Sequence, residues 1–279
     1  MTEESNIHIF EEHSSTLPVW WQHHSSPKTI VYLDAHLDLQ QISGERMDRL
    51  QACSTLEEFK ALEAPHHLNL SPTYAYGIEN FLYAAHRLGF IERLIWIAPP
   101  HIPRHYSPSL IDYMSQMDGL EFDELTGFQP VSKNALHGRL LGLDITICDY
   151  DDLEFLDIDP GYYLDIDIDY FIEVPADRLW IDPAIVTDGI SGQLGSPSLI
   201  TISRAVTSGF TPLAYRFVGD YVHDLLSGKD THVAYYQQLT TALMELGRGE
   251  LEPGSNRINR LISDQPEMAD AYYLSLIHI

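Results

Sequence analysis

Short aliphatic runs separated by helical segments constrain the fold of this chain more than any other feature of its sequence. Runs rich in β-branched and aromatic residues, each typical of a buried strand, occupy residues 29–34, 93–99, 143–149, 161–169 and 198–204. Segments with helical periodicity lie between them, at residues 45–63, 76–88 and 215–226. Strands that alternate with helices need crossover connections, so the sequence predicts an α/β fold with a mostly parallel central sheet flanked by helices.

The domain organisation follows from length and composition. A chain of 279 residues can bury one large core, and no composition shift or linker divides it, so we expect a single domain over residues 1–279. From about Thr231 the periodicity is helical and is broken by the turn signal EPGSN at residues 252–256, which predicts a C-terminal helical segment. In parallel sheets of this kind ligands bind at the carboxyl ends of the strands, so the residues that follow each strand are the first candidates for a site.

Charge and cysteine content narrow the partners and the compartment. The chain has 16 basic and 41 acidic side chains, a net charge of −25, which argues against nucleic acid as a partner and favours a cationic substrate. No signal peptide and no membrane-spanning apolar run is recognisable, so we expect no membrane partner. The two cysteines, Cys53 and Cys148, exclude a disulfide framework and fit a reducing cytoplasm. Assembly into a homo-oligomer stays open.

Three aspartates alternate with aliphatic residues in the segment YYLDIDIDYF, at Asp165, Asp167 and Asp169. On a strand these three side chains share one face. Three carboxylates this close together cannot all stay ionised in a buried site unless a cation lies among them. The alternative is a half-exposed edge strand with a solvated acidic face, but the density of aliphatic neighbours argues against an edge.

A second polar cluster follows the first predicted strand, in the segment VYLDAHLDL. It contains Asp34, His36 and Asp38, each two residues from the next. Carboxylate and imidazole groups at this spacing can converge on a metal ion. An ordinary polar loop is the alternative.

A third cluster lies upstream, in the segment FEEHSS, where His13 follows the carboxylates Glu11 and Glu12. A histidine of this kind is by itself more often a surface or core residue than a ligand.

In chain order, the motifs EEHSS, DAHLD and LDIDID resemble those of the ureohydrolase superfamily, which includes arginase, agmatinase and formiminoglutamase. The similarity is greatest to a divergent branch in which EEH, DAHxDL and LDIDLDYF recur. That branch includes peptide arginases, which convert arginine residues of ribosomally made peptides to ornithine. The resemblance extends over about residues 7–217 and implies an arginase-like three-layer fold with a site for two Mn²⁺ ions.

Carried over position by position, the resemblance assigns roles to four residues of the first two motifs. It makes Asp34 a ligand shared by both metal ions and His36 a ligand of one of them. It makes His13 and Asp38 ligands of the other.

The later motif departs from the family pattern. The family has Asp-x-Asp followed three residues later by Asp-Pro, whereas here three alternating aspartates are followed by Tyr170 and Phe171. Two registers therefore fit the bridging aspartate and the further ligand: Asp165 with Asp167, or Asp167 with Asp169. We prefer the first, and Asp167 is common to both.

Catalytic residues beyond the ligands are implied less directly. The family places a proton-carrying histidine after the Asp-Ala-His-x-Asp motif, and here His66 and His67 occupy the loop APHHLNLS. The family's glutamate that binds the guanidinium has no clear counterpart, because Glu173 is too near the aspartates and the later segment contains only Asp220. Glu79 is another candidate. Each of these residues also fits an ordinary surface role.

Two further loops follow predicted strands and are candidates to border the site. They are SGFTP at residues 208–212 and HIPRHYSP at residues 101–108. A plain surface connector is the alternative for each.

Together these features predict a manganese-dependent hydrolase of guanidino groups. Many carboxylates with two imidazoles and no thiolate suit Mn²⁺ better than a structural zinc site. The resemblance implies conversion of peptidyl arginine to ornithine with release of urea, during maturation of a precursor peptide. In the free-arginine enzymes of the family that this chain resembles, an Asn-containing loop after the Asp-Ala-His-x-Asp motif grips the α-amino and carboxylate groups of the substrate. The segment LQQISGERM, residues 39–47, lacks that form, so the resemblance favours a peptide over free arginine. The alternatives are hydrolysis of another cationic C–N substrate, such as agmatine or an acylated polyamine, and a non-catalytic metal-binding scaffold.

Overall fold

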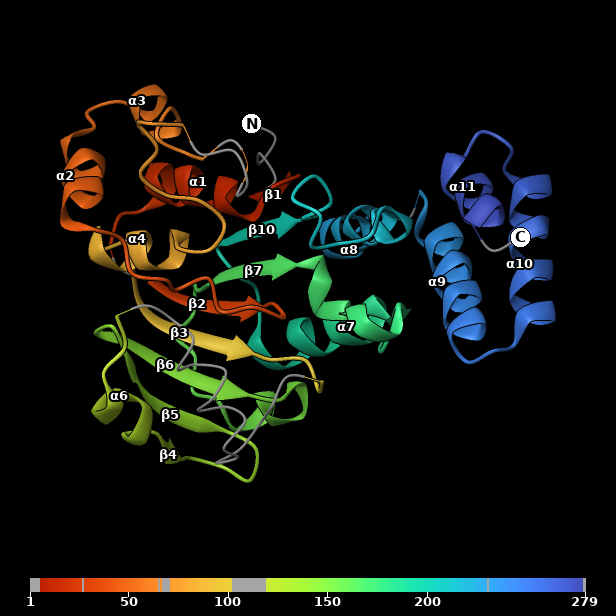
Figure 1. Ribbon diagram of the computed structural model, residues 1–279. Coiled ribbons are helices and arrows are strands. Elements are labelled where there is room, and N and C mark those ends of the chain that lie inside the picture. The colour runs from red at the N-terminus through yellow and green to blue at the C-terminus, as the bar shows by residue number, and fades with distance from the viewer. Residues whose placement is uncertain are drawn as a thin grey trace.

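A mostly parallel β-sheet forms the centre of the protein (Figure 1). The computed structural model describes residues 6–26, 28–64, 66, 71–101, 119–229 and 231–277. Within these residues the sheet has eight strands in the order β1-β10-β7-β2-β3-β6-β5-β4. Their bounds are β1 Ile7–Phe10, β2 Lys28–Leu33, β3 Ile91–Ile97, β4 Gln129–Pro130, β5 Leu136–Leu140, β6 Leu143–Cys148, β7 Tyr163–Asp167 and β10 Leu199–Ser203. The strands from β1 to β6 in this order are parallel, whereas β5 pairs with β6 and β4 pairs with β5 in antiparallel orientation.

The five predicted strands are all present, and the predicted α/β class with a mostly parallel sheet is confirmed. The remaining strands escaped prediction for physical reasons. β1 has four residues at the edge of the sheet, all only partly buried. The sequence of β5 has only a weak strand pattern. β5 joins β6 through a two-residue turn in which Leu141 and Gly142 have φ of 51° and 85°. β8 (Ile172–Glu173) and β9 (Arg178–Leu179) form a short separate hairpin.

Helices cover both faces of the sheet. Their bounds are α1 Thr16–His23, α2 Gly44–Ala52, α3 Leu56–Lys60, α4 Phe81–Arg87, α6 Phe122–Thr126, α7 Pro183–Leu194, α8 Phe217–Ser227, α9 Val233–Gly247, α10 Leu251–Asp264 and α11 Ala269–Ile277. Alternate residues of β2 separate into two buried clusters: Tyr32 packs with residues of α1, α3 and α4, and Leu33 packs with residues of α7 and α8. This separation follows from the two-residue period of a strand buried on both faces.

Two predicted helices differ from the observed ones. The segment 45–63 forms two helices, α2 and α3, because Thr55 accepts a hydrogen bond from the Glu58 backbone and Glu58 reciprocates, a capping box that starts a new helix. The segment 76–88 becomes helical only at Phe81, because Asn80 accepts a hydrogen bond from the Gly77 backbone and so holds the preceding residues in a turn.

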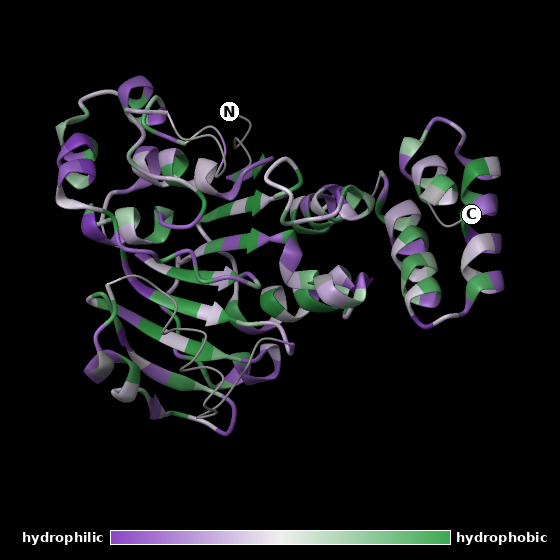
Figure 2. Cartoon of the chain, in the orientation of Figure 1, coloured by the Kyte–Doolittle hydropathy of each residue, from purple (hydrophilic) through white to green (hydrophobic). Residues whose placement is uncertain are grey.

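The C-terminal segment is helical as predicted, but its break lies elsewhere. The EPGSN sequence lies inside α10, with Pro253 in the first turn, where a missing backbone N–H breaks no helical bond. The helices are instead separated at residues 248–250. Helix α9 packs on α8, on β9 and on α10. Figure 1 shows α9, α10 and α11 as a group beyond α8, and Figure 2 shows that hydrophobic and hydrophilic residues are mixed along these three helices.

Among the described residues, none of the helices has the length and apolar character needed to cross a membrane.

Candidate metal centre

The carboxyl ends of β1, β2 and β7 bring the polar clusters of the sequence together. His13 opens a short 3₁₀ helix, η1 (His13–Ser15), after β1, and the Asp34–Asp38 segment follows β2. Asp167 ends β7, and Asp169 lies in the next 3₁₀ helix, η3 (Ile168–Phe171). β2 and β7 are neighbours in the sheet, whereas β1 is separated from β7 by β10. The residues that meet are His13, Asp34, His36, Asp38, Asp165, Asp167 and Asp169.

His13 is surrounded by carboxylates. Its side chain has no exposed surface, and its Nδ1 lies 3.1 Å from Asp34 Oδ2, 3.2 Å from Asp167 Oδ2 and 3.3 Å from Asp38 Oδ2. Despite these contacts, Nδ1 has no partner with hydrogen-bond geometry among the residues that the structure describes. A buried nitrogen among three carboxylate oxygens without a directed bond is the donor arrangement expected around a cation.

His36 forms the second half of the cluster. Its Nδ1 lies 2.8 Å from Asp169 Oδ2 and 3.6 Å from Asp34 Oδ1, and its side chain is 44% exposed. Two sets of side chains could therefore each hold a metal ion, with donor atoms within 4.8 Å of one another in each set. They are His13, Asp34 and Asp38, and Asp34, His36 and Asp169. Asp34 belongs to both, with Oδ2 toward His13 and Oδ1 toward His36.

Asp165 belongs to neither set. Its Oδ2 lies 2.8 Å from Nε2 of His13, on the far side of the ring, and its Oδ1 accepts hydrogen bonds from Thr201 and Thr16. A carboxylate on the second ring nitrogen fixes the imidazole tautomer and turns Nδ1 toward the other carboxylates.

The geometry therefore favours Asp167 and Asp169 as the pair of ligands from the later motif, whereas the pair preferred from the sequence was Asp165 and Asp167. The expectation that all three aspartates share one strand face also differs from the structure, because β7 ends at Asp167. There the chain turns into η3, and Asp167 Oδ1 accepts a hydrogen bond of 3.2 Å from the Asp169 backbone. This turn, rather than strand alternation, presents Asp169 to His36.

Tyr32 supports the cluster and was missed from the sequence. Its ring lies parallel to that of His13, with an interplanar angle of 4° and centroids 5.5 Å apart. Its hydroxyl donates to Asp34 Oδ2 and lies 3.3 Å from Asp38 Oδ2. The available signal was its position two residues before Asp34, on the same face of the strand.

Backbone and indole groups also hold the carboxylates in place. The His36 amide donates to Asp34 Oδ1 at 2.6 Å, and the Ala35 amide donates to Asp169 Oδ1 at 3.2 Å. The Trp96 indole donates to the Asp34 carbonyl at 2.9 Å. The Asp34–Ala35–His36 turn is thus fixed from several directions.

Burial shifts the ionisation of the cluster. Burial and the charge of Asp34 raise the pKa of Asp38 to about 7, and burial and the charge of Asp169 raise the pKa of Asp167 to about 7. Burial and the charge of Asp34 raise the pKa of Asp169 to about 6. Burial opposes the charged form of His36, but the carboxylates of Asp169 and Asp34 outweigh it and raise the pKa. Asp38 and Asp167 are therefore partly protonated at neutral pH, whereas Asp169 is mostly ionised there, and a bound cation would replace the remaining protons.

The predicted catalytic residues lie in different places. His66 interacts electrostatically with Glu12, which directly precedes the candidate ligand His13, so it lies near the centre. His67 lies outside the described residues. Glu79 is exposed, and its charge acts on Arg46 rather than on the cluster.

The two later acids have other partners. Glu173 forms an ion pair with Arg178 across the β8–β9 hairpin, at 2.6 Å. Asp220 pairs with Arg204. Both therefore have structural partners, and neither lies at the cluster.

One of the two candidate loops borders the site. The ring of Phe210, within the SGFTP segment, lies edge-on to His36 with centroids 5.4 Å apart. Of the other loop, His101 is described, whereas residues 102–118 lie outside the described part of the chain.

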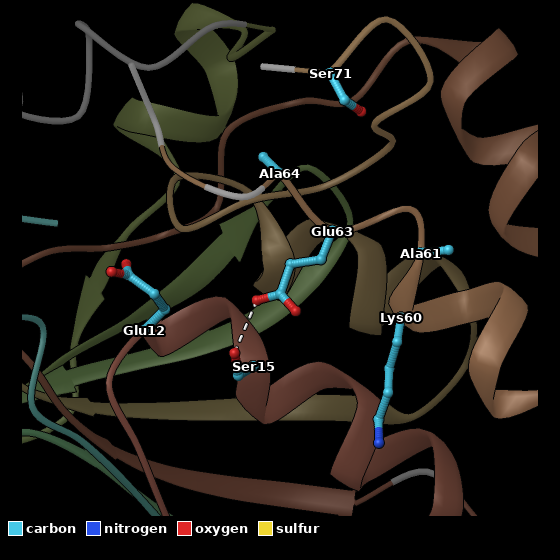
Figure 3. A pocket seen from close by; sticks show the side chains of 7 residues that line it. All are labelled: Glu12, Ser15, Lys60, Ala61, Glu63, Ala64 and Ser71. Atoms are coloured by element: carbon cyan, nitrogen blue, oxygen red, sulfur yellow. Dashed lines mark hydrogen bonds between the residues drawn. The ribbon is translucent and has the colours of Figure 1, made fainter. Parts of the chain in front are cut away.

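A cavity of about 500 Å³ adjoins the centre at Glu12 (Figure 3). Its walls come from the turn before α1 and from the end of α3 and the segment after it. They are Glu12, Ser15, Lys60, Ala61, Glu63, Ala64 and Ser71.

Comparison with known proteins adds no relative: no family model matches the chain, and no curated protein matches its sequence. The fold and site define an α/β protein with a buried cluster of aspartates and histidines able to hold metal.

Proposed function

We propose that this protein is a dimanganese hydrolase with an arginase-like three-layer fold. In this proposal it converts arginine residues of a peptide to ornithine and releases urea. The observation that carries the proposal is the sharing of Asp34 between the two sets of candidate ligands. Two metal ions linked by one carboxylate are a common arrangement for hydrolysis by water.

The residues present fit two manganese ions. His13, Asp34 and Asp38 would hold one ion, and Asp34, His36 and Asp169 would hold the other. Asp167 Oδ2, at 3.2 Å from His13 Nδ1, would add a carboxylate oxygen to the first of these sets. The donors are hard oxygens and imidazoles without thiolate, the set that suits Mn²⁺. When bound, two such ions lower the pKa of a water molecule and make it nucleophilic at neutral pH.

The chain's own residues orient the ligands and manage protons. Asp165 holds His13 in one tautomer, and the Tyr32 hydroxyl stays neutral as a donor because burial and the charge of Asp34 raise its pKa well above the usual value. The leaving amine needs a proton when the C–N bond breaks. His66, close to Glu12, is the described histidine best placed to carry it.

The substrate preference rests on charge and on the segment after the first ligand motif. A net charge of −25 attracts a cationic peptide. Residues 39–47 run through a loop into α2 and lack the asparagine-containing pattern that grips free arginine.

Mass spectrometry tests the proposal directly. An arginine-rich peptide and free arginine are incubated in parallel with the purified protein and Mn²⁺. We expect loss of one CH₂N₂ unit per modified arginine from the peptide, and no loss with Asp34→Ala or Asp167→Ala. Full activity in either variant would sink the dimetal proposal. Turnover of agmatine or an acylated polyamine, with none of the peptide, would support the alternative substrate in place of the peptide. No turnover of any of these compounds despite bound metal would support a non-catalytic scaffold.

A further inference from the structure

The cavity beside the metal centre has acidic groups of its own. It measures about 500 Å³, within the size range of small-molecule sites, and the candidate metal ligands are not among its lining residues. Figure 3 shows that Glu12 and Glu63, both among its lining residues, come from two different segments. Because Glu12 directly precedes His13, the cavity adjoins the metal centre without being part of it.

Glu12 lies between the metal centre and the cavity. Its carboxylate interacts electrostatically with Asp167 on the metal side and with Glu63 on the cavity side. Its Oε1 is buried and makes no hydrogen bond within the described part of the chain, although the Ser208 hydroxyl lies close enough to the carboxylate to oppose the rise in its pKa that burial causes. A buried carboxylate oxygen that lacks a donor is normally satisfied by water or a ligand.

Glu63 has one oxygen engaged by the protein. The hydroxyls of Ser14 and Ser15 both donate to its Oε1, at 2.7 Å and 2.9 Å, and Figure 3 shows the bond to Ser15. These bonds tie Glu63 to the turn that carries His13, a structural role that Oε1 alone fulfils. An ionised carboxylate accepts several hydrogen bonds, so Oε2 retains the capacity to accept from a ligand.

The balance of charge selects the kind of ligand. The lining contains two carboxylates and one ammonium group, that of Lys60, whose side chain is exposed, so that solvent weakens the effect of its charge. The hydroxyls of Ser15 and Ser71 complete the polar lining. A guanidinium or ammonium group, with several N–H donors and a positive charge, complements this surface.

We propose that this cavity binds the cationic group of the substrate, with Glu12 and Glu63 as the residues that determine specificity. Glu12 directly precedes the candidate ligand His13, so a cationic group held by Glu12 lies on the side of the cavity nearer the metal centre. The inference rests on the proposed function for the reaction that follows binding. The binding itself requires only a cationic ligand.

Calorimetry with a charged probe and its neutral analogue tests the site. The probe is N-acetyl-arginine amide and the analogue is N-acetyl-citrulline amide, both titrated into the manganese-loaded protein. We expect the arginine probe to bind and the citrulline analogue to bind at least tenfold more weakly. Glu12→Gln and Glu63→Gln should each weaken binding of the arginine probe by about tenfold or more, because each removes a charged acceptor but keeps its shape.

A matched control and a second variant separate local from general effects. Glu57→Gln removes the same charge from the exposed surface of α3 and should leave binding within about twofold of the unchanged protein. Lys60→Ala removes an opposing charge without disturbing a buried group and should tighten binding of the arginine probe. Manganese content and unfolding midpoint, measured for every variant, identify any variant that fails to fold.

The outcomes distinguish this site from the reaction. Equal probe binding by the unchanged protein and both glutamine variants would overturn the site, as would weaker binding after Lys60→Ala or equal binding of citrulline. Urea is measured in the same samples and in peptide incubations. Selective binding that depends on Glu12 and Glu63 without urea would support the site and contradict the proposed reaction.

Discussion

The three aspartates of β7 and η3 are alike in sequence, but their surroundings give them different tasks. Asp167 lies beside Nδ1 of His13 and Asp169 lies beside Nδ1 of His36, the nitrogens that could bind a metal ion. Asp165 instead contacts the other ring nitrogen of His13, Nε2. We expect Asp165→Ala to weaken Mn²⁺ binding about 10–100-fold without changing its stoichiometry. Asp34→Ala should lower the stoichiometry itself, since both sets lose a ligand. Calorimetric titration with Mn²⁺ checks both, and an unchanged affinity in Asp165→Ala would contradict the supporting role.

Tyr32 offers a second test at the residue scale. Tyr32→Phe keeps the ring stacked on His13 but removes the hydroxyl that donates to the buried Asp34 carboxylate. Hydrogen bonds to charged groups contribute about 1.5–3 kcal/mol, so we expect the metal-free variant to lose about that much unfolding free energy. Urea denaturation measures it. Tyr162→Phe is the control, because that hydroxyl donates to the neutral Gly195 carbonyl and should cost only about 1 kcal/mol. Equal losses of unfolding free energy in the two variants would contradict a hydrogen bond from Tyr32 to an ionised carboxylate.

Proton displacement gives metal binding a defined pH dependence. Because the pKa values of Asp38 and Asp167 are raised to about 7, their carboxyls hold protons below that pH and lose them above it. Mn²⁺ needs the ionised ligands, so its affinity should rise from pH 6 to pH 8, with release of protons into the buffer. Titrations in buffers of different ionisation enthalpy count those protons. A Mn²⁺ affinity that falls from pH 6 to pH 8 would contradict the displacement of protons from Asp38 and Asp167.

At the scale of elements, strands buried on both faces were predictable and edge elements were not. β2, β3, β6, β7 and β10 carry dense β-branched runs, whereas β1 is short and half-buried, and its pairing with β10 depends on residues almost 200 positions away. The candidate ligand motifs were recognisable because they follow the ends of strands. The choice of register was not, since it depends on where β7 stops and η3 begins, a turn set by the Asp167 side chain and the Asp169 amide.

Arg204 tests how β1 is held beside β10. It follows β10 and pairs with Glu11, which follows β1, at 2.8 Å, and with Asp220 of α8. We expect Arg204→Met to lower the free energy of unfolding by about 1 kcal/mol, because Arg204 itself is mostly buried while its partners are partly solvated. Arg178→Met breaks a more exposed pair within the β8–β9 hairpin and should cost roughly 0.5 kcal/mol or less. Urea denaturation measures both free energies of unfolding. A larger loss in Arg178→Met than in Arg204→Met would contradict the greater contribution of the Arg204 ion pairs.

At the scale of the whole molecule, the parallel sheet explains why ligands so distant in sequence meet. Chain direction places the carboxyl ends of β1, β2 and β7 at one edge, and the polar residues that follow them need no further element to converge. The cost is a concentration of buried carboxylates that repel one another. The net charge of −25 adds to this repulsion and draws cations toward the molecule.

A bound cation should therefore stabilise the entire fold rather than one loop. The candidate ligands run from His13 to Asp169, so unfolding separates them and abolishes the site. Mn²⁺ at about 100 times its dissociation constant should raise the free energy of unfolding by about 2.7 kcal/mol for each ion bound. Thermal unfolding with and without Mn²⁺ measures this rise. Mg²⁺ should stabilise less, because it prefers oxygen ligands and keeps its waters. Asp34→Ala should abolish most of the gain, and an equal gain in that variant would place the stabilising metal elsewhere.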